Sequence, residues 1–166
     1  EAQAKILEFI TGRLSVVLKD LGYKHDVVEA VLAQQSANPA ASARAVKQLS
    51  AWVSREDWQS ILPGYARCVR IIRDQKESFK VDGKAFVEAE EKALFKAIQE
   101  NTKSQPVTVD EFLNIVVKLI PSINAFFDKV LVMAEDKKVK ENRLGLLQRI
   151  AKLSDGIADL SPLEGF

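Results

Sequence analysis

Apolar side chains recur every three or four residues along almost the whole chain. The pattern is clear in the segment AKILEFITGRLSVVLKDLGY, in which they are Ile6, Leu7, Ile10, Leu14, Val17, Leu18 and Leu21. This spacing places the side chains on one face of an α-helix. Runs that are rich in strand-forming residues are short and lie inside helical spacing. The sequence therefore predicts an all-α protein.

Helix-capping and helix-ending residues divide this pattern into about seven helices. Gly22 is placed to end the first helix, and Asn38 with Pro39 to begin the third. Ser54 and Asp57 approximate a capping box before the fourth. We expect helices at approximately residues 4–21, 25–34, 39–53, 58–75, 84–101, 109–134 and 139–159, with an irregular tail at 160–166.

Two prolines are expected to interrupt these helices, because proline lacks the amide proton that a helix interior uses. The Pro63-Gly64 pair would divide the fourth helix into two pieces, and Pro121 would separate residues 109–119 from residues 122–134. We expect the 166 residues to form one bundle-type domain with no internal boundary or repeat. Since the chain starts at Glu1 without Met, already inside a helical pattern, we interpret it as a fragment of a longer protein.

Composition argues against several classes of function. The net charge of +1 is not that of a purely electrostatic nucleic-acid binder, although it allows a local basic face. With a single Cys the chain can form no internal disulfide. One Cys and one His are also too few for the ligands of a zinc site or the groups of a catalytic triad. We therefore expect no metal, no cofactor and no active site in this chain, a reducing compartment, and no membrane span.

A stripe of basic side chains is the clearest candidate binding feature. On a helix with about 100° per residue, Arg67 and Arg70 lie opposite the apolar side, Arg73 lies at its edge, and Lys76 would extend the stripe. Guanidinium groups pair with phosphates and stack on unpaired bases. The alternative is an ordinary solvated face, whose local charge is diluted by the nearby Asp74.

Most other chemically capable side chains are expected to be structural. Cys68 falls on the apolar side as a small core residue, and His25 stands at a helix start in a capping or surface position. Three carboxylates among lysines, Glu88, Glu90 and Glu91, are expected on a solvated helix face. The large apolar side chains expected in the core include Trp52, Trp58, Phe126, Phe127, Val130 and Met133.

Three segments resemble a known family when taken in order. They are LEFITGRLSVVLKDLGYKHDVVEAVLA, EAEEKALFKAI and FFDKVLVMAEDKKVKENRLGLLQRI, and together they resemble the C-terminal region of the β subunit of bacterial-type glycyl-tRNA synthetase. In that family the region is an all-helical anticodon-binding domain, related to those of the arginyl class. The residues that match best are Phe9, Arg13, Leu14, Asp26, Ala30, Val31, Phe127, Asp128, Val132, Met133, Glu135, Asp136, Asn142, Arg143 and Leu144.

The resemblance implies a parent enzyme that attaches glycine to tRNA(Gly) with ATP and Mg²⁺ at a site in its catalytic α part. This fragment is then expected to bind the anticodon stem-loop without performing chemistry, in contact with the catalytic α subunit or region. The cytoplasm is the expected location, with the chloroplast or mitochondrion as alternatives. In YARCVRII the family pattern is kept at Arg67 and Ile71, whereas Ala66 and Arg70 replace the Lys and Asn that the family pattern has there.

The polar segment AEDKKVKEN leads to two further candidates, Asn142 and Arg143. They are either RNA contacts or a structural clasp, bonded to neighbouring backbone or to Asp128 and Glu135. Asp136 is placed to cap the last helix. An alternative function also stays open, because an amphipathic bundle of near-zero net charge is equally typical of a helical protein-interaction module without a nucleic-acid role.

Overall fold

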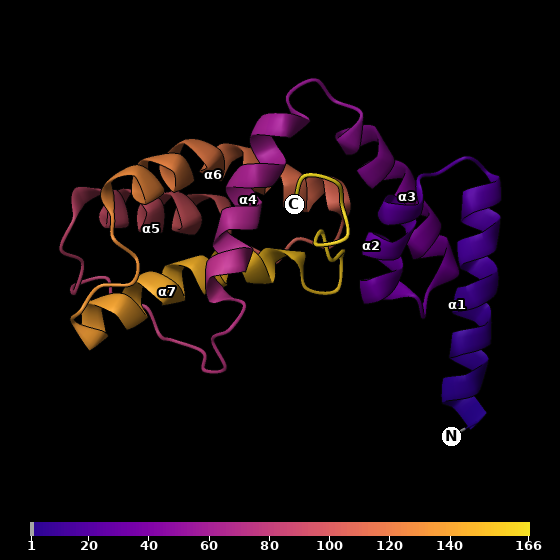
Figure 1. Cartoon of the computed structure of the whole chain (residues 1–166), viewed down its shortest axis with the longest axis horizontal. Coiled ribbons are helices and arrows are strands. Elements are labelled where there is room, and N and C mark those ends of the chain that lie inside the picture. Colours follow the sequence, from indigo (N-terminus) through magenta and orange to yellow (C-terminus); the bar gives the residue numbers. More distant parts are fainter. Residues whose placement is uncertain (1) are drawn as a thin grey trace.

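The computed structural model describes residues 2–166, so Glu1 lies outside the described residues. These residues form seven α-helices and one 3-10 helix and include no strand, which confirms the predicted all-α fold (Figure 1). The elements are α1 (Ala2–Asp20), α2 (His25–Gln35), α3 (Pro39–Val53), α4 (Trp58–Ile72), α5 (Ala89–Asn101), α6 (Val109–Lys129), α7 (Lys137–Ala151) and the 3-10 helix η1 (Lys152–Ser154).

The helices form two groups with α4 between them (Figure 1). Helices α1, α2 and α3 lie on one side, and α5, α6 and α7 lie on the other, where α4 packs on both α6 and α7. The C-terminal segment returns to the first group and ties the two together. The amide of Asp159 donates to the carbonyl of Ala30 at 2.8 Å, and Gln35 Nε2 donates to the carbonyl of Ile157 at 2.7 Å.

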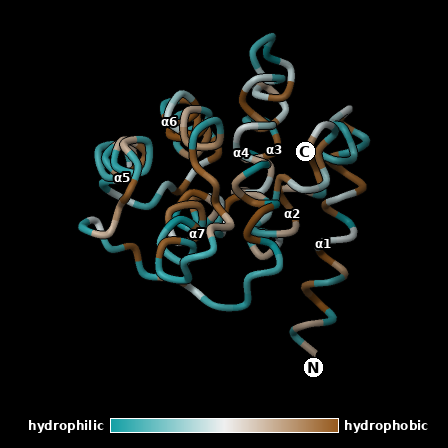
Figure 2. Tube along the Cα trace, turned by 60° about the vertical axis from the view of Figure 1, so that its left-hand side comes forward, coloured by the Kyte–Doolittle hydropathy of each residue, from teal (hydrophilic) through white to brown (hydrophobic). Residues whose placement is uncertain are grey.

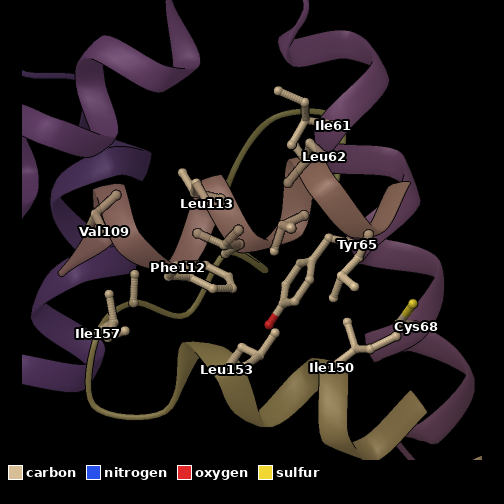
Figure 3. Close-up of a cluster of buried hydrophobic side chains, with 14 of the residues drawn as sticks. Ile61, Leu62, Tyr65, Cys68, Val109, Phe112, Leu113, Ile150, Leu153 and Ile157 are labelled. Atoms are coloured by element: carbon tan, nitrogen blue, oxygen red, sulfur yellow. The ribbon is translucent and has the colours of Figure 1, made fainter. Parts of the chain in front are cut away.

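The centre of the core lies where α4, α6 and the end of α7 meet (Figure 3). The ring of Tyr65 packs edge-on against Phe112, with 5.3 Å between the centroids, and its hydroxyl lies 2.9 Å from Ser154 Oγ. Burial raises the pKa of the Tyr65 hydroxyl above its ordinary value. Cys68 is fully buried, and burial raises the pKa of its thiol to about 12, so it is the inert core residue that was predicted.

The two expected proline breaks are wrong. Pro63 and Pro121 lie inside continuous helices, α4 and α6. A Cβ added to Gly64 would lie 2.6 Å from Ile120 Cδ1, so the two helices approach closely beside both prolines. The Pro-Gly pair therefore marks a helix crossing, where packing on both sides of the proline offsets the lost helical hydrogen bond.

Several other predicted boundaries differ from the structure, including the end of α4 at Ile72. Helix α5 begins at Ala89, because residues 79–88 form an irregular connection instead of a first helical turn. Helix α6 ends at Lys129, and α7 ends at Ala151, where the 3-10 helix and turns replace the predicted extension. The expected Ser54–Asp57 capping box is absent, since the Asp57 carboxylate instead pairs with Arg55 at 2.6 Å.

Helix α1 differs most from its prediction. Only Leu18 of its predicted apolar face is fully buried, and Leu21 is 70% exposed, as is Phe9. The reason is that α1 packs mainly on α2 at the edge of the molecule, where Figure 2 shows apolar stretches along its free half. Met133 is also exposed, contrary to expectation, whereas Trp52, Trp58, Phe126 and Val130 are buried as predicted and Phe127 is half-buried.

The unequal burial of two phenylalanines gives a test of this architecture. We expect Phe112→Ala to lower the free energy of unfolding by ~3–5 kcal/mol, because Phe112 is fully buried and its removal leaves a cavity. The matched variant Phe9→Ala should change it by less than about 0.5 kcal/mol. Urea unfolding followed by circular dichroism measures both, and equal losses would contradict the placement of α1 at the edge.

Candidate nucleic-acid interface

Helix α4 presents the predicted basic stripe to solvent. Tyr65 and Cys68 are buried on one side of the helix, and three exposed guanidinium side chains follow its free side: Arg67, Arg70 and Arg73, here called the arginine face. Three residues turn an α-helix by about 300°, so each arginine lies about 60° around the helix from the previous one. The three side chains therefore form a ridge that winds along α4. Arg73 is the C-cap residue of α4, and Lys76, which is exposed as well, lies beyond the end of the helix.

Two of the three arginines lie against aromatic rings. The Arg67 Cζ atom is 4.6 Å from the ring centroid of Phe127 on α6, and the Arg70 Cζ atom is 6.0 Å from that of Phe166. The ion pairs within residues 2–166 include none of the arginine face. The rings therefore orient the guanidinium planes while the charge remains available for a phosphate or a base.

Lys76 lies in a groove whose lining has as many carboxylates as lysines. The connection after α4 and the start of α7 enclose this groove of about 380 Å³, which brings Lys76 together with Lys137 and Lys140. Acidic residues of the same segments also line this groove, and Lys137 Nζ lies 3.7 Å from Glu141 Oε1. The sequence does not reveal this grouping, because the lysines are some sixty residues apart along the chain.

Asn142 and Arg143 are buried, with 4% and 6% of their surfaces exposed. Asn142 donates to the carbonyl of Asp82 at 3.1 Å and accepts from its amide at 2.7 Å. Arg143 Nε donates to Glu91 Oε1 at 2.9 Å, and its Nη1 donates to the carbonyl of Leu131 at 2.8 Å. Their burial and these internal hydrogen bonds favour the clasp alternative over direct RNA contact.

The partner of Arg143 is Glu91, and not the expected Asp128 or Glu135. Glu91 is fully buried, so its expected place on a solvated face is wrong. Its Oε2 accepts from the amides of Val87 at 2.9 Å and Glu88 at 2.6 Å, which caps the start of α5. Burial acts to raise the pKa of Glu91, but the hydrogen bonds from Arg143 and these amides outweigh it, and the pKa lies below its ordinary value.

Helix α7 also holds the irregular connection between α4 and α5. Gln148 accepts from the amide of Phe79 at 2.9 Å and donates to the carbonyl of Glu77 at 2.7 Å. A Cβ on Gly145 would lie 3.0 Å from the carbonyl oxygen of Phe79, so glycine allows this close crossing. We call Asn142, Arg143, Gln148 and Glu91 the α7 clasp. It fixes the segment that carries Lys76 against α7.

The remaining candidate from the sequence is His25. His25 lies on the surface, where its Nε2 is 2.8 Å from Glu29 Oε1. Across residues 2–166 no group of three or more His, Cys, Asp or Glu side chains is placed to hold a metal ion. No helix of this part of the chain is long and apolar enough to cross a membrane.

An all-α domain with a solvent-exposed arginine ridge on one helix is the class of protein that these features define. The DALR anticodon binding domain family matches residues 61–160, which include all of the arginine face and the α7 clasp. The chain therefore belongs to the DALR anticodon binding domain family. This membership agrees with the resemblance stated from the sequence.

Known relatives match almost the whole chain. It is 34% identical to "Glycine--tRNA ligase, chloroplastic/mitochondrial 2" of Arabidopsis thaliana, covering 97% of this chain and 16% of that protein. It is 35% identical to a glycine--tRNA ligase beta subunit of Sulfurihydrogenibium sp. and 34% to that of Moorella thermoacetica, covering 96% and 97% of this chain and 24% of each relative. The chain thus spans about a quarter or less of the length of the curated relatives it matches.

A double-mutant cycle tests the clasp. We expect Arg143→Met to cost ~3–5 kcal/mol of unfolding free energy, because it leaves the Glu91 carboxylate buried without its partner. The effects of Arg143→Met and Glu91→Gln on the free energy of unfolding should be coupled by about 1–3 kcal/mol at pH 7. The matched pair Arg143→Met and Asp128→Asn should show no coupling.

The pH dependence of this coupling follows from the lowered pKa of Glu91. A carboxyl group whose folded pKa is depressed contributes stability above its unfolded pKa and loses it as the pH falls through the folded value. The coupling should therefore be complete at pH 7 and shrink as the pH falls below about 4.5. Urea unfolding at several pH values measures it, and a coupling that is constant down to pH 2.5 would contradict the ion pair.

Proposed function

We propose that this chain binds the anticodon stem-loop of tRNA(Gly) as a non-catalytic module of a glycine–tRNA ligase. The observation that carries the proposal is the family match over residues 61–160, since this range contains the exposed arginine face. The relatives named glycine–tRNA ligase supply the identity of the tRNA. ATP, Mg²⁺ and glycine are bound elsewhere in this proposal, in a catalytic α subunit or region with which this domain assembles.

The geometry of the arginine face suits a single-stranded loop. Such loops present unstacked bases, which proteins read by stacking and by hydrogen bonds to base edges as well as by phosphate contacts. Arg67 is held in place by Phe127 and remains exposed, so it is the residue proposed to contact the loop first. Arg70 and Arg73 continue the same surface, and the exposed Lys76 extends it beyond the end of α4.

A near-neutral net charge fits this way of binding. With a net charge of +1 the whole molecule supplies little long-range attraction for RNA, so the affinity depends on local contacts. We propose the cytoplasm as the location, or an organelle as for the relative named chloroplastic/mitochondrial. A helical protein-interaction module without a nucleic-acid role is the alternative, and the comparisons offer it no support.

Substitution of Arg67 tests the proposal. We expect Arg67→Ala to weaken binding of a tRNA(Gly) anticodon stem-loop by ~1–3 kcal/mol if the guanidinium contacts a base, or to reduce the salt slope by about one if it contacts only phosphate. Arg44→Ala is the matched control, because it removes the same charge from an exposed position on α3. Fluorescence anisotropy titrations at 50 and 200 mM salt measure both quantities.

Three outcomes are informative. Loss with Arg67→Ala but not with Arg44→Ala supports the arginine face as the binding surface. Equal losses of affinity in the two variants would show that Arg67 contributes only non-specific electrostatic attraction. An unmodified chain that fails to bind the stem-loop at 50 mM salt, while a protein partner is captured by pull-down from the source organism, would favour the interaction module.

A further inference from the structure

A cleft of about 340 Å³ opens beside the arginine face, between α4 and the returning C-terminal segment. Its apolar wall is built from Tyr65, Val69 and Ile72 of α4, and the ring of Phe166 closes one side. The volume is many times that of a water molecule, about 30 Å³. This cleft cannot be recognised in the sequence, because its walls come from segments some ninety residues apart.

The cleft and the arginine face share α4. Val69 and Ile72 line the cleft, while Arg70 and Arg73 follow each of them directly in the helix and are exposed. Phe166 connects the two features, because it lines the cleft and also lies 6.0 Å from the Arg70 Cζ atom. The cleft therefore lies directly beside the surface along which the RNA is proposed to bind.

The polar lining favours a base over a phosphate. Asp155 and Asp159 supply two carboxylates to the cleft against the single cation of Lys152, so a phosphate group would meet net repulsion. Carboxylate oxygens accept hydrogen bonds from the amino groups of bases, as Asp and Glu do with cytosine N4. Asp159 Oδ1 already accepts from Ser161, which leaves Oδ2 without a hydrogen bond from residues 2–166.

Gln34 adds a second kind of polar group to the same cleft. Its Oε1 accepts from the amide of Gly156 at 3.0 Å, and this bond fixes the side chain of α2 against the C-terminal turn. The amide nitrogen of Gln34 is then a donor for a carbonyl oxygen. Acceptors, a donor, apolar walls and an aromatic ring are together what a flipped-out nucleobase requires.

We propose that this cleft receives one unstacked base of the bound RNA loop, and that the base carries an exocyclic amino group, as cytosine, adenine and guanine do. This inference rests on the proposed function, since it assigns one subsite within the same RNA complex. The arginine face holds the backbone and stacks on neighbouring bases, while the cleft selects the base by its amino group. Uracil, which lacks that group, is disfavoured.

Removal of a carboxylate gives a test with a diagnostic sign. Asp155 is exposed and its side chain makes no hydrogen bond within residues 2–166, so Asp155→Ala should leave the fold intact. General electrostatics predicts that losing a negative charge strengthens RNA binding. If the Asp155 carboxylate accepts a hydrogen bond from a base, the opposite is expected, and Asp155→Ala lowers the RNA affinity by roughly three- to tenfold. Asp20→Ala on α1 is the matched control for charge.

The probes are the anticodon stem-loop of tRNA(Gly) and loops in which one anticodon nucleotide at a time is abasic or replaced by uridine. We expect Asp155→Ala to weaken the intact loop and to leave unchanged the loop whose inserted base is missing. Val69→Phe, which fills the cleft, should weaken the intact loop by roughly tenfold and the same abasic loop far less. Circular dichroism and urea unfolding establish that both variants are folded.

The outcomes separate this inference from the proposed function. The unmodified chain could bind the intact loop while Asp155→Ala and Val69→Phe leave the affinity for every loop unchanged. Alternatively, Asp155→Ala could strengthen the binding of every loop, as Asp20→Ala does. In either case the cleft is not a base subsite and the proposed function stands. If the unmodified chain binds no loop, the proposed function and this inference are both overturned. The inference is supported if both variants bind the intact loop more weakly and this loss of affinity disappears when one particular anticodon nucleotide is abasic.

Discussion

The buried ion pair between Arg143 and Glu91 is the interaction on which the rest of the structure depends. Two charges can be removed from water only when their hydrogen-bonding groups are satisfied, and here they are. Glu91 accepts from Arg143 and from two amides at the start of α5, while Arg143 also donates to the carbonyl of Leu131. One ion pair thus joins α5, α7 and the connection between α6 and α7.

Two arginines of the same chain have opposite roles because their surroundings differ. Arg143 is surrounded by a carboxylate and a carbonyl inside the domain, so it stabilises the fold. Arg67 is exposed above the ring of Phe127, with no carboxylate partner among residues 2–166, so its charge is available to a ligand. The clasp fixes the irregular connection that follows α4, and it thereby positions Lys76 near the start of α7.

Periodicity was sufficient to predict the all-α fold, the separation of Arg67 and Arg70 from the buried side of α4, and the core position of Cys68. It failed where tertiary contacts override local preference. Pro63 and Pro121 were expected to break helices, but both lie where α4 and α6 approach closely. The exposure of α1 was missed because an apolar face in a sequence does not reveal what covers it. Glu91 gave no clear signal, since its N-cap residue is Glu88 and not Ser or Thr.

The proposed function requires that this domain recognise the base sequence of an anticodon loop through the arginine face and the surfaces beside it. The most direct measurement is a titration of the 166-residue chain with the tRNA(Gly) anticodon stem-loop and with loops of altered anticodon, at two salt concentrations. We expect loops with altered anticodons to bind at least roughly tenfold more weakly at both salt concentrations. Equal affinity for every loop, with a salt dependence that is also the same, would contradict it.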